Sequence, residues 1–130
     1  MGCPAGFGLE AVVEVRDSEG VAEDVFDAGE PVVLFAGVRN HSVHSTTLES
    51  RNSCLVGDWT LESTDGREIV APIVCATAVT PFRFPPDEVV GRTWDWDVAE
   101  EGDWTLTVTF GTPEPPPTTI EFTVIPSPGR

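Results

Sequence analysis

Alternating apolar and polar positions run along most of the chain and predict short β-strands. The clearest case is residues 104–110, where every second residue is apolar and those between are threonines, as expected of a strand with one face on a core. Residues 89–98 alternate in the same way, with Trp94 and Trp96 on the apolar face. Because a short acidic turn containing a glycine joins the two runs, we expect residues 89–110 to form an antiparallel hairpin.

The same pattern predicts the remaining strands. The segment 32–39 is apolar on both faces, so it should lie inside a sheet. Asp65 and Gly66 supply a hairpin turn, and Pro72 marks an edge or a bend in the return strand. The other expected strands are residues 7–16, 58–63, 68–74 and 118–125, with short candidates at 21–26 and 46–50.

Two proline-bearing segments interrupt this pattern. Residues 75–88 contain Pro81, Pro85 and Pro86, which resist both helix and central strand, so this segment is expected to be a long crossover pinned by Phe82 and Phe84. Residues 111–117 hold four prolines and are expected to form a stiff, extended loop.

The fold expected from these elements is all-β. About seven to nine short strands without a sustained helical period predict an antiparallel two-sheet β-sandwich of the immunoglobulin-like kind. A barrel is the alternative, which the proline-bearing crossover disfavours. The 130 residues fit one domain, residues 1–130, with an ordered core at about residues 7–125.

The charge balance narrows the choice of partners. Against 22 acidic residues stand seven basic ones, all arginine, for a formal net charge of −15. Such a charge repels nucleic acid and anionic membranes, and no apolar run is long enough to span a bilayer. We expect a monomer with a protein partner. The acidity is explained equally by adaptation to high salt and by an ordinary acidic protein of a GC-rich genome.

The three cysteines suggest a cellular compartment. Cys3 follows Gly2, as at the processing site of a bacterial lipoprotein, which makes Cys3 a lipidation candidate and leaves Cys54 and Cys75 available for one disulfide in an exported or cell-envelope protein. The alternative is a cytoplasmic protein with three reduced thiols.

The sequence contains few residues that could support catalysis or metal binding. The chain has no lysine, no tyrosine and only two histidines, so we expect neither an enzyme nor a cofactor. His41 and His44 lie on a polar connection and lack metal-ligand spacing. Acidic residues around the expected hairpin are weak calcium candidates that match no calcium-loop signature, so a solvated negative face is favoured: Asp95, Asp97, Glu100, Glu101 and Asp103.

The tryptophans allow a further interpretation. A row of exposed aromatic rings would stack on sugars, but Trp59, Trp94 and Trp96 share their faces with apolar residues. They are therefore expected in the core.

The order of several short motifs resembles that of the BsuPI family of intracellular proteinase inhibitors, whose members have an immunoglobulin-like sandwich. The motifs include a strand that ends in Asn40, an Asp-Gly turn followed by basic, acidic and apolar residues, a Phe-x-Pro turn and two tryptophan strands. They are residues 28–32, 38–42, 65–69, 84–88, 93–95 and 102–106.

The chain departs from the family pattern in four places. Asp87 replaces a turn glycine, Glu101 replaces a proline and Trp104 replaces a tyrosine. The aromatic residue that usually follows the Asp-Gly hairpin is missing, with Ala71 and Pro72 in its place. The resemblance covers scaffold motifs, so it implies no inhibitory residue.

The expected function is therefore that of a non-enzymatic protein-binding module which resembles BsuPI-type proteinase inhibitors and acts through its stiff loops. The partner is a protein, in the narrowest case a protease. The alternative is a structural or accessory domain of an exported lipoprotein without inhibitory activity. Candidate contact residues lie in the two proline-bearing segments: Pro81, Phe82, Arg83, Pro113 and Pro115.

Overall fold

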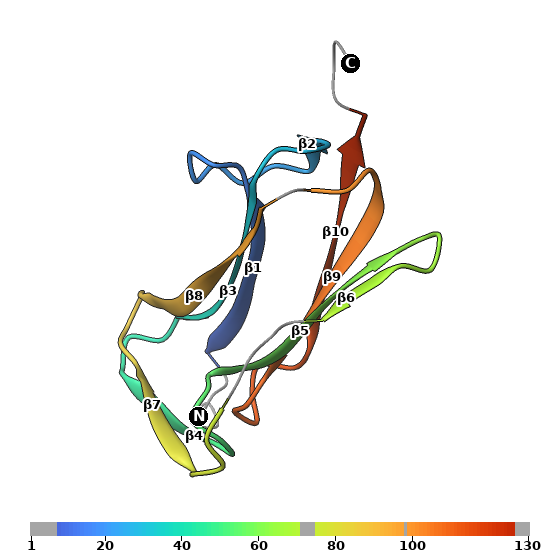
Figure 1. The fold of residues 1–130 in the computed structure, drawn as a ribbon. Helices are drawn as coiled ribbons and strands as arrows, with labels where there is room; N and C mark the ends of the chain where they lie inside the picture. Colours follow the sequence, from blue (N-terminus) through green and yellow to red (C-terminus); the bar gives the residue numbers. More distant parts are fainter. Residues whose placement is uncertain (1–7, 71–74, 98, 127–130) are drawn as a thin grey trace.

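A computed structural model describes residues 8–70, 75–97 and 99–126 (Figure 1). These residues contain ten β-strands and no helix, which confirms the all-β expectation and exceeds the seven to nine strands predicted. No helix within these ranges is long and apolar enough to cross a membrane. The strands are β1 (Leu9–Arg16), β2 (Val25–Asp27), β3 (Val32–Asn40), β4 (Thr46–Ser50), β5 (Val56–Ser63), β6 (Glu68–Val70), β7 (Thr80–Phe84), β8 (Val89–Trp96), β9 (Gly102–Phe110) and β10 (Thr118–Ile125).

The strands form three sheets rather than two. One sheet has the order β1-β3-β8, a second has the order β2-β10-β9-β5-β6, and a third consists of β4 and β7 alone. All these pairs are antiparallel except β2 with β10. As predicted, β3 lies inside its sheet, between β1 and β8.

The predicted hairpin of residues 89–110 is wrong in its pairing. Both arms are strands, but β8 pairs with β3 in one sheet and β9 pairs with β10 and β5 in another. The reason is that both arms have a strongly apolar face. These faces pack toward each other across the core, as the rings of Trp96 and Trp104 show with centroids 5.1 Å apart.

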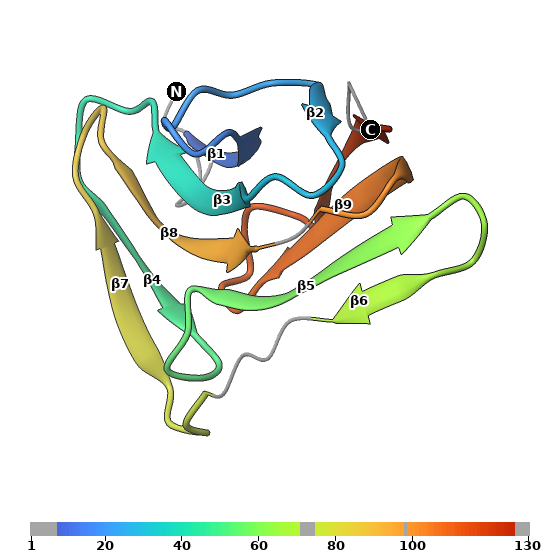
Figure 2. The same ribbon diagram turned by 45° about the horizontal axis from the view of Figure 1, so that its top comes forward.

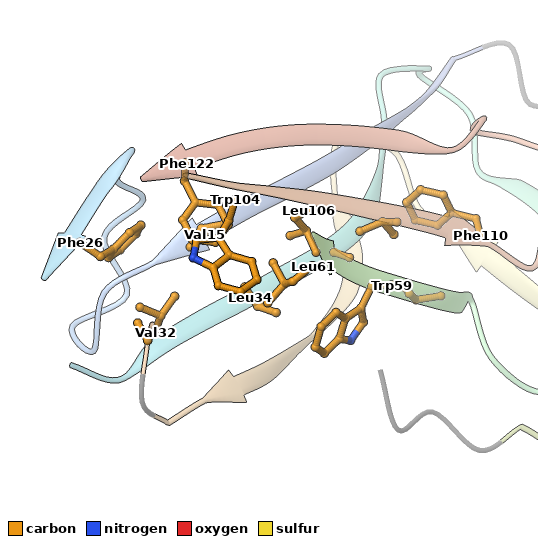
Figure 3. Close-up of a cluster of buried hydrophobic side chains, with 14 of the residues drawn as sticks. Val15, Phe26, Val32, Leu34, Trp59, Leu61, Trp104, Leu106, Phe110 and Phe122 are labelled. Carbon is orange, nitrogen blue, oxygen red and sulfur yellow. The ribbon is translucent and has the colours of Figure 1, made fainter. Parts of the chain in front are cut away.

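The core lies between the three-stranded and five-stranded sheets (Figure 3). Trp104, Leu34 and Leu61 are at most 1% exposed, and Trp59 is 5% exposed. Trp94 and Trp96 are half-buried and pack against this cluster. The expectation that the tryptophans belong to the core rather than to a sugar-binding surface is confirmed for these residues.

The third sheet continues the β3–β8 pair as a bent ribbon (Figure 2). The chain runs from β3 into β4 and returns through β7 into β8, so β4 and β7 pair just beyond the ends of β3 and β8. The crossover predicted at residues 75–88 is therefore partly wrong, because Pro81 lies inside β7 opposite Glu49. A proline is tolerated there since β7 is an edge strand. Phe84 is fully buried, as expected of an anchor.

Asn40 fixes the bend of this ribbon. Its side chain is fully buried, and its Nδ2 donates to the carbonyls of His44 and Phe84, both at 2.8 Å. Its Oδ1 accepts the backbone N–H of Ser42 at 2.8 Å. Since a buried amide needs partners for its polar atoms, these three bonds hold the turn after β3 to the end of β7.

The Asp-Gly turn is confirmed. It joins β5 to β6, and Gly66 has a φ of +93°. At this turn Arg67 donates to Asp65 at 2.9 Å and to the carbonyl of Glu101 at 2.7 Å. Its guanidinium carbon lies 4.9 Å from the centroid of the Trp104 ring. Arg67 therefore ties the β5–β6 hairpin to the chain that leads into β9. Of the expected return strand 68–74, the structure describes residues 68–70 as β6, and Pro72 lies outside the described residues.

Candidate functional site

A disulfide joins Cys54, which lies just before β5, to Cys75, which lies before β7. The two Cα atoms are 5.7 Å apart. Beside the bridge, the backbone N–H of Ser53 donates to the carbonyl of Ala76 at 2.9 Å, and the N–H of Ala76 donates to Ser53 Oγ at 2.7 Å. The predicted pairing of the two cysteines is confirmed, and it attaches the far end of the β4–β7 ribbon to the five-stranded sheet.

A groove lies between this ribbon and the proline-rich loop. It has a volume of about 480 Å³ and is open to solvent. Glu49, Ser50 and Arg51 line it on the ribbon side together with Val79, and prolines of residues 111–117 line it on the other side. The loop predicted at residues 111–117 and the β4–β7 ribbon therefore form the walls of one site. On the ribbon side, Val79 comes from the predicted crossover 75–88, and residues 49–51 do not.

Backbone bonds hold the two walls together at the base of the groove. The N–H of Arg51 donates to the carbonyl of Gly111 at 3.1 Å, and the N–H of Gly111 donates to the carbonyl of Leu55 at 2.8 Å. Ser50 is fully buried, and its hydroxyl donates to the carbonyl of Cys54 at 2.8 Å. These bonds fix the distance between ribbon and loop without filling the groove.

Charge is distributed unevenly between the two ends of the molecule. The neutral end, which we define as residues 46–56, 75–84 and 110–118, holds two acidic residues and two arginines. The acidic end, defined as residues 17–30 and 95–103, holds 11 of the 22 acidic residues and no arginine. Figure 1 shows the β4–β7 ribbon of the neutral end at the bottom and β2 of the acidic end at the top. The groove thus belongs to the neutral end of a strongly acidic protein, where acidic residues and arginines balance.

The predicted contact residues differ in their placement. Pro81 and Arg83 are exposed on β7, and Arg83 donates to the hydroxyl of Ser45 at 2.9 Å. Phe82 is half-buried against the core. Pro113 is exposed in the groove wall. Pro115 also lines the groove but is buried.

The burial of Pro115 follows from the shape of its loop. The loop was predicted to be extended, but it turns back on itself. The hydroxyl of Thr112 donates to the carbonyl of Glu114 at 2.7 Å, and the Glu114–Pro115 peptide is cis. In this loop Pro113 is exposed and Pro115 is buried.

Sequence reasoning missed the ribbon side of the groove. Glu49, Arg51 and Val79 were not identified, although Val79 is an exposed apolar side chain, 62% accessible. The sequence carried no clear signal for them. Residues 31–48 and 69–86 are both free of acidic residues, but the first stretch is mostly β3, so a map of charge along the chain would not have singled out the groove.

The calcium candidates do not converge. Asp95 lies near the end of β8 in one sheet and Asp103 lies near the start of β9 in another, while Asp97 lies on the connection that follows β8. Asp103 accepts a bond from the hydroxyl of Thr123 at 2.9 Å. Within residues 8–70, 75–97 and 99–126, no three His, Cys, Asp or Glu side chains form a group that could hold a metal ion.

His41 and His44 do not line the groove. His41 contacts Glu10, with 2.9 Å between its Nε2 and a carboxylate oxygen, and His44 is exposed. Cys3, the lipidation candidate, lies outside the described residues.

The electrostatics of the hairpin turn are separate from the groove. The hydrogen bond from Arg67, followed by that from Ser63, lowers the pKa of Asp65 from 3.8 to about 2. The ion pair is exposed to solvent, so it identifies a structural contact of the β5–β6 turn and not a reactive group.

Comparisons with known proteins give distant structural similarity only. No family model matches the chain, and no curated protein matches its sequence. Among solved structures, the DNA glycosylase AlkC of Pseudomonas fluorescens is 11% identical with a TM-score of 0.48, over 95% of this chain and 31% of its own. A β-glucosidase of Listeria innocua is 12% identical with a TM-score of 0.43, over 92% of this chain and 16% of its own. This chain therefore spans less than a third of the length of either protein.

A third match is a single domain. The CARDB domain of a Pyrococcus furiosus protein, solved in complex with two metal ions, is 12% identical with a TM-score of 0.45, over 92% of this chain and 96% of its own.

Proposed function

We propose that this protein is a non-enzymatic protein-binding module whose contact surface is the neutral end. One observation carries the proposal: the β4–β7 ribbon and the proline-rich loop, remote in sequence, are held together around an open groove at the neutral end of a protein of net charge −15. Charged residues are depleted from the cores of protein interfaces because they lose hydration there. The neutral end is therefore the part of this surface that a partner covers at the lowest desolvation cost.

The rigidity of the groove walls supports the same function. The disulfide fixes one wall, Asn40 fixes the bend that carries it, and prolines restrict the other wall. A surface that is ordered before binding loses little conformational entropy when a partner docks. The non-enzymatic part of the proposal rests on the poor inventory of catalytic side chains in the sequence.

The narrower proposal is inhibition of a proteinase, and it rests on the resemblance to the BsuPI family. The exposed edge of the ribbon, with Pro81 and Arg83, is the segment that would enter a protease cleft. A panel of serine proteases assayed with excess protein tests this directly. Full activity of every protease removes inhibition from the proposal and leaves the binding role in place.

The disulfide favours a second candidate, an accessory domain of the cell envelope. Disulfides persist in oxidising compartments, so the Cys54–Cys75 bridge supports a proposal of export. Intact mass and peptide mapping of protein isolated from its native cells, with free thiols blocked at lysis, test this. Alkylation of Cys54 and Cys75 without reductant would contradict export.

Photo-crosslinking tests the proposed contact surface. A benzophenone amino acid at Val79, in the groove, is compared with one at Val25, an exposed apolar residue of β2 at the acidic end, 53% accessible. We expect a crosslinked protein partner from position 79 and none from position 25. Equal crosslinking at both positions, or none at position 79, would contradict the proposal.

A further inference from the structure

The free edge of β4 faces the groove. β7 takes one edge of β4, and no strand of the described residues takes the other. Directly after β4, the N–H of Arg51 bonds to Gly111 at 3.1 Å, so this second edge is turned toward the proline-rich loop. Glu49 and Ser50 of β4 line the groove. Backbone groups of this edge are thus available beside the groove at Glu49, and the edge continues beyond the groove along Thr46–Leu48.

The opposite wall cannot occupy that edge. Four of the seven residues in 111–117 are prolines, which have no N–H to donate and do not form a ladder within a sheet. The loop therefore stands beside β4 without pairing with it, and the groove between them stays open.

The two edges of the ribbon are protected differently. β7 contains Pro81 and Arg83, a proline and a positive charge, which are the residues that edge strands use against unwanted pairing. β4 has one charge, Glu49, among threonine, leucine and serine. The ribbon is therefore guarded on the side away from the groove and open on the side that faces it.

We infer that the groove binds an extended, uncharged segment of a partner protein, which adds to β4 as a further strand. This deepens the proposed function and rests on it. An uncharged segment is favoured because the neutral end offers no excess charge, whereas a basic segment is drawn to the acidic end and an acidic one is repelled by the net charge of −15. The five residues of β4 span about 17 Å, so the bound segment pairs over about five residues. Main-chain bonds supply most of the affinity, as in other strand additions.

The test uses the whole protein and a capped six-residue peptide of alternating threonine and valine, followed by NMR. We expect chemical shift changes and slowed hydrogen exchange at the amides of Thr46–Ser50 with millimolar peptide. The same peptide with N-methyl groups on alternate residues lacks half of its donors and should bind at least about tenfold more weakly. Equal binding of both peptides, or no change at β4, would overturn the inference.

A variant pair tests the edge itself. Thr47 on β4 and Thr93 on β8 are both exposed threonines in edge strands. Thr47→Lys places a charge on the open edge and should weaken peptide binding, and Thr93→Lys adds the same charge away from the groove and should not. If both variants bind the peptide as the parent does, strand addition at β4 is refuted. Crosslinking from position 79 would then still support the proposed function, because a partner can fill the groove through side chains alone.

Discussion

Removing the disulfide should destabilise the fold by an amount that the chain length predicts. Cys54 and Cys75 are separated by 21 residues in the sequence. In the chain-entropy treatment, a crosslink that closes a loop of this length lowers the entropy of the unfolded chain by an amount that contributes about 3 kcal/mol to the free energy of unfolding at 25 °C. The perturbation is the double variant Cys54→Ser/Cys75→Ser, compared with its disulfide-bonded parent. Both proteins also carry Cys3→Ser, so that no third thiol can exchange.

The assay is equilibrium unfolding in urea without reductant, monitored by tryptophan fluorescence. We expect the free energy of unfolding to fall by about 3 kcal/mol and the melting temperature by about 10 °C. The crosslinked protein treated with reductant should behave as the double variant, which separates loss of the bridge from the change of side chain. A loss below about 1 kcal/mol would refute the reasoning and show that the bridge does not constrain the unfolded chain.

Three further changes test the framework of the site. Asn40→Ala leaves two carbonyls without their buried donor and should lower the free energy of unfolding by about 2–4 kcal/mol. Hydrogen exchange in β4 and β7 should become faster, and unchanged exchange there would contradict the role of Asn40 at the bend. Gly37→Ala places a Cβ 2.7 Å from a backbone oxygen of β8 and should lower the free energy of unfolding in urea by about 1–3 kcal/mol. The control is Gly57→Ala, whose new Cβ has its nearest atom at 3.6 Å and should cost less stability. Equal losses for the two variants would be evidence against close packing at Gly37. Arg67 lowers the pKa of Asp65 from 3.8 to about 2, so the contribution of ionised Asp65 to folding stability is complete above pH 3.8 and is lost as the pH falls through about 2. The free energy of unfolding should therefore fall less steeply with decreasing pH in this range for Asp65→Asn than for the parent. Identical pH dependence of the two proteins would rule out the Arg67 contact in solution.

The sequence pattern predicted strand positions better than strand partners. The alternation in residues 89–96 and 102–110 identified β8 and β9 and their buried faces. It did not show that the two faces oppose each other across the core, because alternation specifies which side of a strand is apolar and not which sheet it joins. The nearness of the two strands in sequence favoured a hairpin, and the contact of Trp96 with Trp104 required separate sheets instead.

Prolines were interpreted too strictly. Pro81 was expected to exclude a strand, yet it lies in β7, where an edge position needs no second row of donors. The same rule correctly left residues 111–117 without a strand. The difference between the two segments lies in their partners, since β4 is available to β7, and a partner in space cannot be seen from local composition.

The candidate site was predicted in part. One wall, residues 111–117, was identified as a stiff segment, whereas the ribbon wall around Glu49 and Arg51 was missed. The Cys54–Cys75 pair was identified from cysteine positions. The convergence of the walls depends on the bend at Asn40 and on the bond between Arg51 and Gly111. Both are long-range contacts that no periodicity encodes.

The central claim, that the neutral end binds the partner, is tested most directly by charge placed in the groove. Once the crosslinked partner is purified, its affinity is measured by calorimetry for Val79→Glu and for Val25→Glu, both substitutions at exposed valines. A negative charge at position 79 must be desolvated in the bound state, so the account predicts a loss of at least about tenfold in affinity for Val79→Glu and none for Val25→Glu. Unchanged affinity for Val79→Glu, or an equal loss for both variants, would contradict it.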